Sequence, residues 1–228
     1  NNSSIILVLV FLHLNGFAFA AINKAWISRS TGITEGKVNC LYTGGRMEKF
    51  ILAGTDKALY RSSNDLNAFQ PVLELYGSYK TINQIQSDVQ DAATLYSATD
   101  AGVFVSRDQG ETWDNIFAPG GALARKALCV LADGGTVYAG TTDGLYIRRA
   151  GETEWKKDSR ELGKTVIFHL ADGDDYFYAT TETEIYRVSK TDGELQKVYT
   201  AIGQQDEQQE FDEEGEPIRQ TVIKDLLS

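Results

Sequence analysis

The hydrophobic and polar positions of this chain follow one pattern four times. In each copy a short apolar run leads into a threonine among small or polar residues, and a second run follows in which apolar and polar residues alternate. The copies cover residues 51–64, 95–108, 137–150 and 177–190, and their threonines are Thr55, Thr99, Thr141 and Thr181. Alternation with a period of two is typical of β-strands, so each copy predicts a β-hairpin.

Each copy is flanked by two further predicted strands. A short apolar run precedes it at residues 37–42, 81–86, 127–132 and 165–170. A more polar strand follows it, and these strands open with Phe69, Trp113, Trp155 and Leu195. A repeat of about 40–45 residues that holds four short strands is typical of the blades of a β-propeller.

The sequence therefore predicts an all-β fold, a β-propeller of four-stranded antiparallel blades. The blades are expected at about residues 37–75, 80–117, 126–159 and 164–200, within a domain that spans 21–228. Residues 25–30 match the outer strand of a preceding blade, and residues 220–227 match the inner strand of a fifth. Common propellers have about four to eight blades, so we interpret the chain as part of a ring of about six to eight. A closed four-bladed ring is the alternative.

The beginning of the chain has the pattern of a secretory signal peptide. Residues 5–14 are almost entirely apolar, and this run is too short for a membrane span of about 20 residues. Ala18 and Ala20 supply the small residues that precede cleavage. We expect residues 1–20 to be a signal peptide and the protein to be exported, to the periplasm or the extracellular space. The alternatives for membrane contact are an uncleaved anchor here or a segment C-terminal to this sequence.

The charge of the chain argues against nucleic-acid binding. There are 22 basic and 32 acidic residues, which give a formal net charge of −10. Such a protein lacks the broad basic surface that binds phosphate backbones. Hydrophobic residues make up 42% of the chain and charged residues 24%, which is ordinary for a globular protein.

The two cysteines, Cys40 and Cys129, occupy the same column of two repeats that are not adjacent. Equivalent positions of non-neighbouring blades stand further apart than the roughly 4.4–6.8 Å that separates the Cα atoms of a disulfide. We therefore expect two free thiols that behave as small buried hydrophobes, although an exported protein could oxidise them.

One segment carries a specific motif. Ser106, Asp108, Gly110, Thr112 and Trp113 complete the pattern S-x-D-x-G-x-T-W. Here the chain resembles the Asp-box propellers, also called bacterial neuraminidase repeats. That superfamily includes sialidases, xyloglucanases, sortilin-type receptors and photosystem II assembly-factor-like proteins. The resemblance extends over about residues 25–228, and the other three repeats carry degenerate boxes.

The role expected of this box is structural. The Asp108 carboxylate can accept hydrogen bonds from the backbone of the turn, and Gly110 permits a positive φ there. Trp113 can bury a large apolar surface between sheets. The resemblance implies that such boxes lie on the outer rim, away from catalytic centres. Asp108 is therefore expected to determine the fold rather than to act as an acid or base.

The residues predict no catalytic site, metal site or cofactor. The resemblance implies that a sialidase needs an arginine triad that begins in an Arg-Ile-Pro type motif. No arginine stands two residues before Pro71, Pro119 or Pro217. His169 has no second histidine or cysteine pair at metal-ligand spacing, so it is expected to be structural. An enzymatic role is less favoured than binding, and would be that of a glycoside hydrolase.

A column of basic residues predicts a binding site. Alignment of the inner strands places Lys37, Lys80, Lys126, Lys164 and Arg219 just before the apolar residues of each strand. Inner strands of a propeller begin around one mouth of the central channel, where such a ring would attract an anionic ligand or an acidic partner. The alternative is that lysines at strand ends only aid solubility.

An acidic segment lies in the link to the predicted fifth inner strand, on the same face as this ring. Residues 204–216 hold seven acidic residues and no basic one. Such runs are usually solvated. The alternative is a lid that competes with anions for the ring.

The expected function is that of an exported, non-catalytic propeller, a scaffold for binding or assembly whose site lies on the channel face. Its partner would be an unidentified protein or an anionic or carbohydrate ligand. The first alternative is a sialidase- or xyloglucanase-like glycoside hydrolase, or a lectin-like module in which Tyr76 and Tyr79 stack on a sugar. The second alternative is the ectodomain of a membrane sensor.

Overall fold

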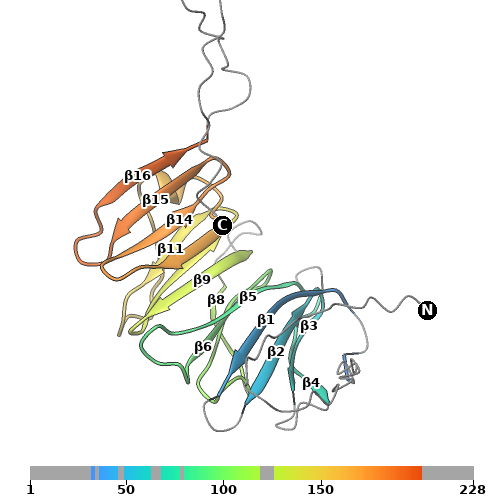
Figure 1. Cartoon of the computed structure of the whole chain (residues 1–228). Helices are drawn as coiled ribbons and strands as arrows, with labels where there is room; N and C mark the ends of the chain where they lie inside the picture. Colours follow the sequence, from blue (N-terminus) through green and yellow to red (C-terminus); the bar gives the residue numbers. More distant parts are fainter. Residues whose placement is uncertain are drawn as a thin grey trace, which may run out of the picture.

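The computed structural model describes residues 32–33, 36–45, 49–62, 68–77, 80–118 and 126–201. These residues form four separate four-stranded antiparallel sheets, which follow one another along an arc (Figure 1). The predicted all-β fold with four-stranded antiparallel blades is confirmed. The predicted signal peptide at 1–20, the outer strand at 25–30 and the fifth inner strand at 220–227 lie outside the described residues.

Every sheet is hydrogen-bonded in chain order, from its first strand to its fourth. Sheet 1 holds β1 (Val38–Gly44), β2 (Phe50–Thr55), β3 (Ala58–Ser62) and β4 (Phe69–Glu74). Sheet 2 holds β5 (Ile82–Ser87), β6 (Leu95–Thr99), β7 (Gly102–Ser106) and β8 (Asp114–Phe117). Sheet 3 holds β9 (Ala127–Asp133), β10 (Thr136–Thr141), β11 (Gly144–Arg148) and β12 (Lys156–Lys157). Sheet 4 holds β13 (His169–Asp172), β14 (Tyr176–Thr180), β15 (Glu184–Ser189) and β16 (Leu195–Thr200).

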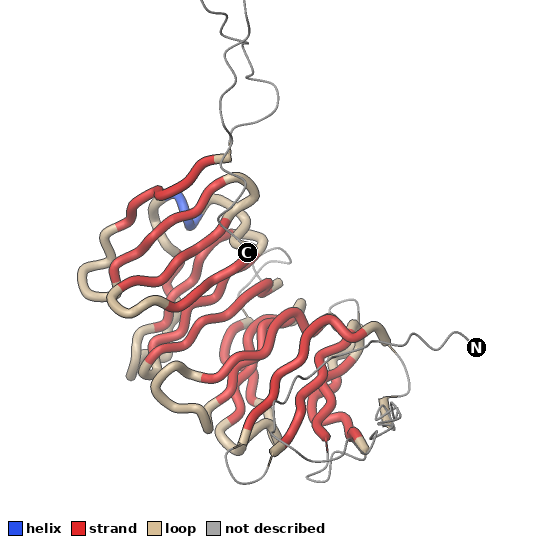
Figure 2. Tube along the Cα trace, viewed as in Figure 1, coloured by secondary structure: helices blue, strands red, loops and turns tan. Residues whose placement is uncertain are grey.

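Helix is almost absent from the described part of the chain. It is confined there to one turn of 3-10 helix, η1 (Glu161–Gly163), in the link between sheets 3 and 4 (Figure 2). None of the described residues belongs to a helix long and apolar enough to cross a membrane.

The first strands of the four sheets are the inner ones, and they run in the same direction. Near their starts, Asn83 Nδ2 of β5 donates to the Ala127 carbonyl of β9 at 2.8 Å. Past the end of β5, the Val89 N–H donates to the Ala132 carbonyl of β9 at 2.9 Å. Because the strands are aligned in this way, all of them begin at one face of the arc.

The recurring threonines close the turns between the second and third strands of each sheet. The hydroxyl of each donates to the carbonyl three residues further on, at 2.9 Å for Thr55 and Thr99, 2.7 Å for Thr141 and 3.4 Å for Thr181. Thr55, Thr99 and Thr141 are fully buried, so their hydroxyls need a partner inside the protein. This local hydrogen bond explains why the sequence repeats a threonine at this position.

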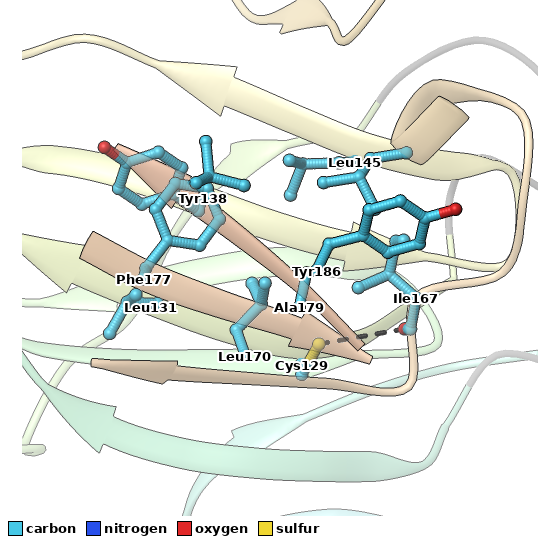
Figure 3. Close-up of a cluster of buried hydrophobic side chains, with 11 residues drawn as sticks. Cys129, Leu131, Tyr138, Leu145, Ile167, Leu170, Phe177, Ala179 and Tyr186 are labelled. Atoms are coloured by element: carbon cyan, nitrogen blue, oxygen red, sulfur yellow. Dashed lines mark hydrogen bonds between the residues drawn. The ribbon is translucent and has the colours of Figure 1, made fainter. Parts of the chain in front are cut away.

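The hydrophobic core lies between the sheets. At the junction of sheets 3 and 4, Leu131, Tyr138 and Leu145 from one sheet contact Leu170 and Phe177 from the other (Figure 3). The Tyr138 and Phe177 ring centroids are 4.3 Å apart. Similar clusters fill the junctions of sheets 1 and 2 and of sheets 2 and 3. Each sheet thus buries its apolar side chains against its neighbours.

The two tryptophans that open outer strands pack on the preceding sheet. Trp113 contacts the cluster between sheets 1 and 2, and its Nε1 donates to the Gly110 carbonyl at 3.2 Å. Trp155 stacks near Phe117, with ring centroids 4.6 Å apart, and its Nε1 donates to the Ile116 carbonyl at 2.7 Å. Both indoles are therefore partly buried with their donor satisfied.

One strand differs from the prediction. Sheet 4 begins at His169, whereas the apolar run predicted an inner strand at 165–170. The N–H of Ile167 donates to the Thr141 carbonyl of sheet 3 at 3.1 Å. Because this residue is bound to the neighbouring sheet, the ladder of sheet 4 starts after it.

A buried carboxylate joins sheets 2 and 3 at the face where the inner strands end. Asp88 is 4% exposed. It accepts the N–H groups of Gln90 and Gly134 on Oδ1, both at 2.9 Å, and that of Gly135 on Oδ2 at 3.0 Å. These glycines form the β9–β10 turn, so one side chain of sheet 2 satisfies two backbone donors of sheet 3.

A second polar link continues from this point to sheet 4. Asp133 accepts a hydrogen bond from Gln90 Nε2 at 2.7 Å and lies 2.7 Å from Lys190 Nζ. Lys190 also lies 2.6 Å from Asp172. Three successive sheets are thus connected through polar side chains on this face.

We expect Asp88→Ala to lower the free energy of unfolding by about 2–4 kcal/mol, because it leaves three backbone donors without their acceptor. Urea denaturation measures this change. Asp114→Ala is the matched control: its exposed carboxylate pairs with Arg107 at 3.5 Å, and such a surface pair contributes less than about 1 kcal/mol. Equal effects of the two substitutions would contradict the role of Asp88.

The prediction of two free cysteines is confirmed; Cys129 is buried as expected, whereas Cys40 is only partly buried. The Cys40 thiol donates to the Ile82 carbonyl of the next inner strand at 3.8 Å, and the Cys129 thiol donates to the Ile167 carbonyl, just before β13, at 3.7 Å. A Cβ on the glycine paired with each cysteine would lie only 2.5 Å (Gly54) or 2.4 Å (Gly140) from the sulfur. Cysteine and glycine therefore occur together in sheets 1 and 3 because they share one limited space.

We expect both thiols to react slowly with Ellman's reagent at pH 8, since only the thiolate is nucleophilic. Burial raises the pKa of Cys40 to about 11 and that of Cys129 to about 12. Release of two equivalents of thionitrobenzoate is expected only after denaturation in urea. Labelling of the native protein at the rate of free cysteine would contradict this.

Candidate functional site

The face at which the inner strands begin carries the predicted lysines. The residue after each turn threonine donates its N–H to an inner-strand carbonyl: Asp56 to Lys37 at 3.2 Å, Asp100 to Thr81 at 2.9 Å, and Thr142 to Lys126 at 3.3 Å. Lys37 and Lys126 are thus equivalent in the blades, whereas the equivalent of sheet 2 is Thr81. Lys80 precedes that position by one residue.

Lys164 belongs to the link between sheets 3 and 4. It follows η1 directly, and its N–H donates to the Glu161 carbonyl at 3.0 Å. The structure therefore places four predicted lysines on one face, but only Lys37 and Lys126 form a true column. Arg219 lies outside the described residues.

Carboxylates of the turns lie on the same face. Lys126 Nζ is 3.6 Å from Asp100, which also accepts a hydrogen bond from Asn83 at 3.2 Å. Asp56 accepts the backbone N–H of Lys37 at 3.0 Å. In the part of the chain that the structure describes, no carboxylate forms an ion pair with Lys80 or Lys164. The face can thus attract an anion, chiefly through those two side chains.

The residues of the predicted Asp-box, 106–113, form the turn between β7 and β8. Asp108 Oδ1 accepts the N–H groups of Glu111 and Thr112 at 3.1 and 2.9 Å, and Oδ2 accepts the Thr112 hydroxyl at 2.5 Å. Ser106 donates its hydroxyl to Asp108 at 2.7 Å and accepts the N–H of Gly110 at 2.8 Å. Gly110 has φ of +87°, as its place in the motif predicts. The box residues therefore hold one another in a fixed turn.

This turn also contacts the preceding sheet, through a residue that the motif does not include. Arg61 of β3 donates from Nε to the Gln109 carbonyl at 3.1 Å, and its guanidinium lies 4.7 Å from the centre of the Phe50 ring. A Cβ on Gly110 would lie 3.0 Å from Leu52. The turn thus joins sheets 1 and 2. The sequence did not predict this contact, because a single arginine in an alternating strand is not distinctive.

The degenerate turn of sheet 4 keeps part of this pattern. Asp192 accepts the N–H of Glu194 at 3.0 Å and donates its own N–H to the Ser189 hydroxyl at 3.4 Å. Sheet 3 keeps Trp155 without the aspartate. The tryptophan and the carboxylate are therefore separable parts of the box.

Two clusters that the sequence did not predict pair a tyrosine, a carboxylate and a lysine. Asp143 accepts from Tyr146 at 2.9 Å and pairs with Lys157 at 2.8 Å. In sheet 4, Glu184 accepts from Tyr186 at 2.5 Å and pairs with Lys197 at 2.6 Å. Burial, and then the hydrogen bond to the carboxylate, raise the pKa of each tyrosine to about 12. Both carboxylates are neutralised within their clusters, so these groups stabilise the outer strands.

A pocket of about 490 Å³ opens at the other face, between the first hairpin and sheet 2. Tyr42, Gly44, Lys49, Phe50 and Ala92 are among its lining residues. Among the described residues there is no group of three or more histidine, cysteine, aspartate or glutamate side chains that could hold a metal ion.

We expect Asp108→Ala to lower the free energy of unfolding by about 1–2 kcal/mol at pH 7, through loss of the turn hydrogen bonds. Burial alone would raise the pKa of Asp108, but hydrogen bonds from Thr112, Ser106 and Glu111 outweigh it and lower the pKa. The stabilisation is therefore complete above the unfolded pKa of about 3.9 and is lost as the pH falls through the lower folded value.

Urea midpoints of the parent and Asp108→Ala, taken from pH 7 down to about pH 2.5, test this prediction; the difference should shrink at acid pH. Asp174→Ala, in an exposed turn, is the control and should show no such convergence. A difference that stays constant over this range would contradict the role given to the ionised carboxylate.

No family model and no curated protein matches this sequence. Solved structures do match its fold. An ancestral GH74 enzyme is 21% identical over 74% of this chain, with a TM-score of 0.60. The extracellular domain of a candidate one-component system from B. thetaiotaomicron is 19% identical over 75% of the chain, with a TM-score of 0.57. YCF48, solved with a bound D1 peptide, is 12% identical over 72% of the chain, with a TM-score of 0.53.

These likenesses establish a β-propeller-like fold for the described sheets. The chain spans only 26% of the GH74 enzyme and 23% of the extracellular domain, and 54% of YCF48. The four sheets thus correspond to a part of each of these longer chains.

Proposed function

We propose that this protein is an exported β-propeller scaffold that binds an acidic partner on the face where its inner strands begin. The observation that carries the proposal is the placement of four lysines on that face, of which Lys80 and Lys164 have no carboxylate partner among the described residues. The rest of the chain is acidic, with a net charge of −10, so a local basic group there would direct an anionic partner to one place.

The fold neighbours support a binding role without assigning a ligand. One of them is a propeller-like protein solved with a bound peptide, and another is an extracellular domain of a signalling system. The extracellular domain is consistent with export, and the peptide complex is consistent with recognition of a protein partner, although fold alone does not specify chemistry. We also propose that the chain is a member of the Asp-box superfamily, which the hydrogen bonds of the 106–113 turn support.

A fluorescein-labelled decaglutamate peptide is a suitable probe, with binding followed by fluorescence anisotropy at low salt. We expect Lys80→Ala/Lys164→Ala to weaken binding by about tenfold, because both side chains lie at the proposed site and are uncompensated. Raising the ionic strength to about 0.15 M should reduce the difference between the parent and this variant.

Lys49→Ala/Lys156→Ala is the matched control, since it removes the same charge from the opposite face and from an outer strand. It should bind the peptide almost as the parent does. Equal weakening by the two double variants would show that only net charge matters, and no weakening by either would show that this face does not bind acidic peptides. Either result would overturn the proposal.

A further inference from the structure

The side of sheet 4 that faces away from sheet 3 carries exposed tyrosines and, paired with one of them, the half-buried Arg187. Tyr178 of β14 is 37% exposed, whereas its equivalents in sheets 2 and 3, Tyr96 and Tyr138, are 4% and 8% exposed. Tyr199, paired with Ile185 on the same side, is 55% exposed. In sheets 2 and 3 this side is covered by the next sheet, so sheet 4 presents a face shaped for the same kind of contact.

The covered junctions share one hydrogen bond. A side-chain donor of each inner strand binds a carbonyl at or just before the start of the next one: Cys40 donates to Ile82, Asn83 to Ala127, and Cys129 to Ile167, two residues before β13 (Figure 3 shows the third). These bonds fix the height of each inner strand relative to the preceding one.

His169 occupies the corresponding place in sheet 4. It pairs with Thr180, the residue before the turn threonine, as Cys40 pairs with Gly54 and Cys129 with Gly140; in sheet 2 this place is taken by Gln84, and the donor Asn83 precedes it by one residue. The imidazole is exposed, and no acceptor for it lies among the residues that the structure describes. An N–H donor is therefore in position for a carbonyl of a following strand.

The sequence holds a matching strand. The inner strands carry an apolar pair three residues apart that faces the preceding sheet, as in Ile82/Ile85 and Ala127/Val130. Ile223 and Leu226 repeat this spacing. Ile223 follows Ile167 by about 43 residues once the acidic segment 204–216 is left out, which matches the repeat length of the blades.

We propose that residues 220–227 cover this face as the inner strand of a fifth blade. In this arrangement Ile223 and Leu226 pack against sheet 4, and His169 donates to the Ile223 carbonyl. The occupant is this chain's own segment because it combines the right apolar spacing with the right distance along the sequence.

The test introduces a cysteine on the face of sheet 4 that the proposed strand would cover. Ala171 is exposed and pairs with Tyr178, as the fully buried Leu131 pairs with Tyr138. In the full chain carrying Ala171→Cys, we expect Ellman's reagent to label the new thiol at least about tenfold more slowly than free cysteine. Adding Leu226→Asp should restore fast labelling. Cys40 and Cys129 report unfolding, since both stay unreactive while the blades are intact.

Val222→Asp is the matched control. Its equivalents, Lys37, Thr81 and Lys126, stand just before the apolar pair and belong to none of the clusters between the sheets, so labelling should stay slow. Fast labelling in the parent, or equal acceleration by Val222→Asp and Leu226→Asp, would overturn the proposal. Protection that disappears on dilution would assign the face to a second copy of the chain and would also overturn it.

The role of His169 has its own readout. His169→Asn keeps an N–H donor, as Asn83 supplies one in sheet 2, and should retain the protection of Ala171→Cys. His169→Ala removes the donor and should speed labelling by about threefold or more. Equal labelling rates of the two His169 variants would exclude the hydrogen bond. The docking of the strand is tested separately, by the labelling rate with Leu226→Asp.

Discussion

The structure depends on one constraint: no sheet of this protein can bury its apolar face alone. Each inner and middle strand has side chains on two sides, and each side that faces a described neighbouring sheet is buried against it. Tyr96 and Tyr138 are buried because a sheet follows them, and Tyr178 is exposed because none of the described sheets does. Stability is therefore a property of the junctions, as expected for a repeat architecture in which each unit contacts its neighbours.

The junctions are joined by side chains because the inner strands do not form a common ladder. The polar groups that cross them differ from one junction to the next, a thiol in two places and an amide in another, with the Asp88 carboxylate at the opposite face. Their common feature is that they satisfy backbone groups that the sheets leave unpaired. Burial of an unpaired N–H or C=O is costly, so these positions admit several residue types but require a donor or an acceptor.

Much of the fold could be predicted from the sequence because its signals are local. The turn threonines, the free cysteines and the positive φ of Gly110 are confirmed, since each follows from hydrogen bonding or sterics within a few residues or within one column of the repeat. The lysine ring was less predictable. In an alignment Lys80 looks equivalent to Lys37 and Lys126. The backbone hydrogen bonds show instead that Thr81, one residue later, is the equivalent position in sheet 2.

The sequence by itself determined the four-stranded repeat, because period-two alternation and turn chemistry are properties of neighbouring residues. Only the tertiary structure decided which side chains cross the junctions. Arg61 reaches the Asp-box of the next sheet, and Asp88 closes a turn of the sheet after its own. These contacts join residues more than forty positions apart, and no local pattern marks them. They arise from the angle and height at which one sheet packs on the next. This packing geometry is set by the burial of whole apolar faces.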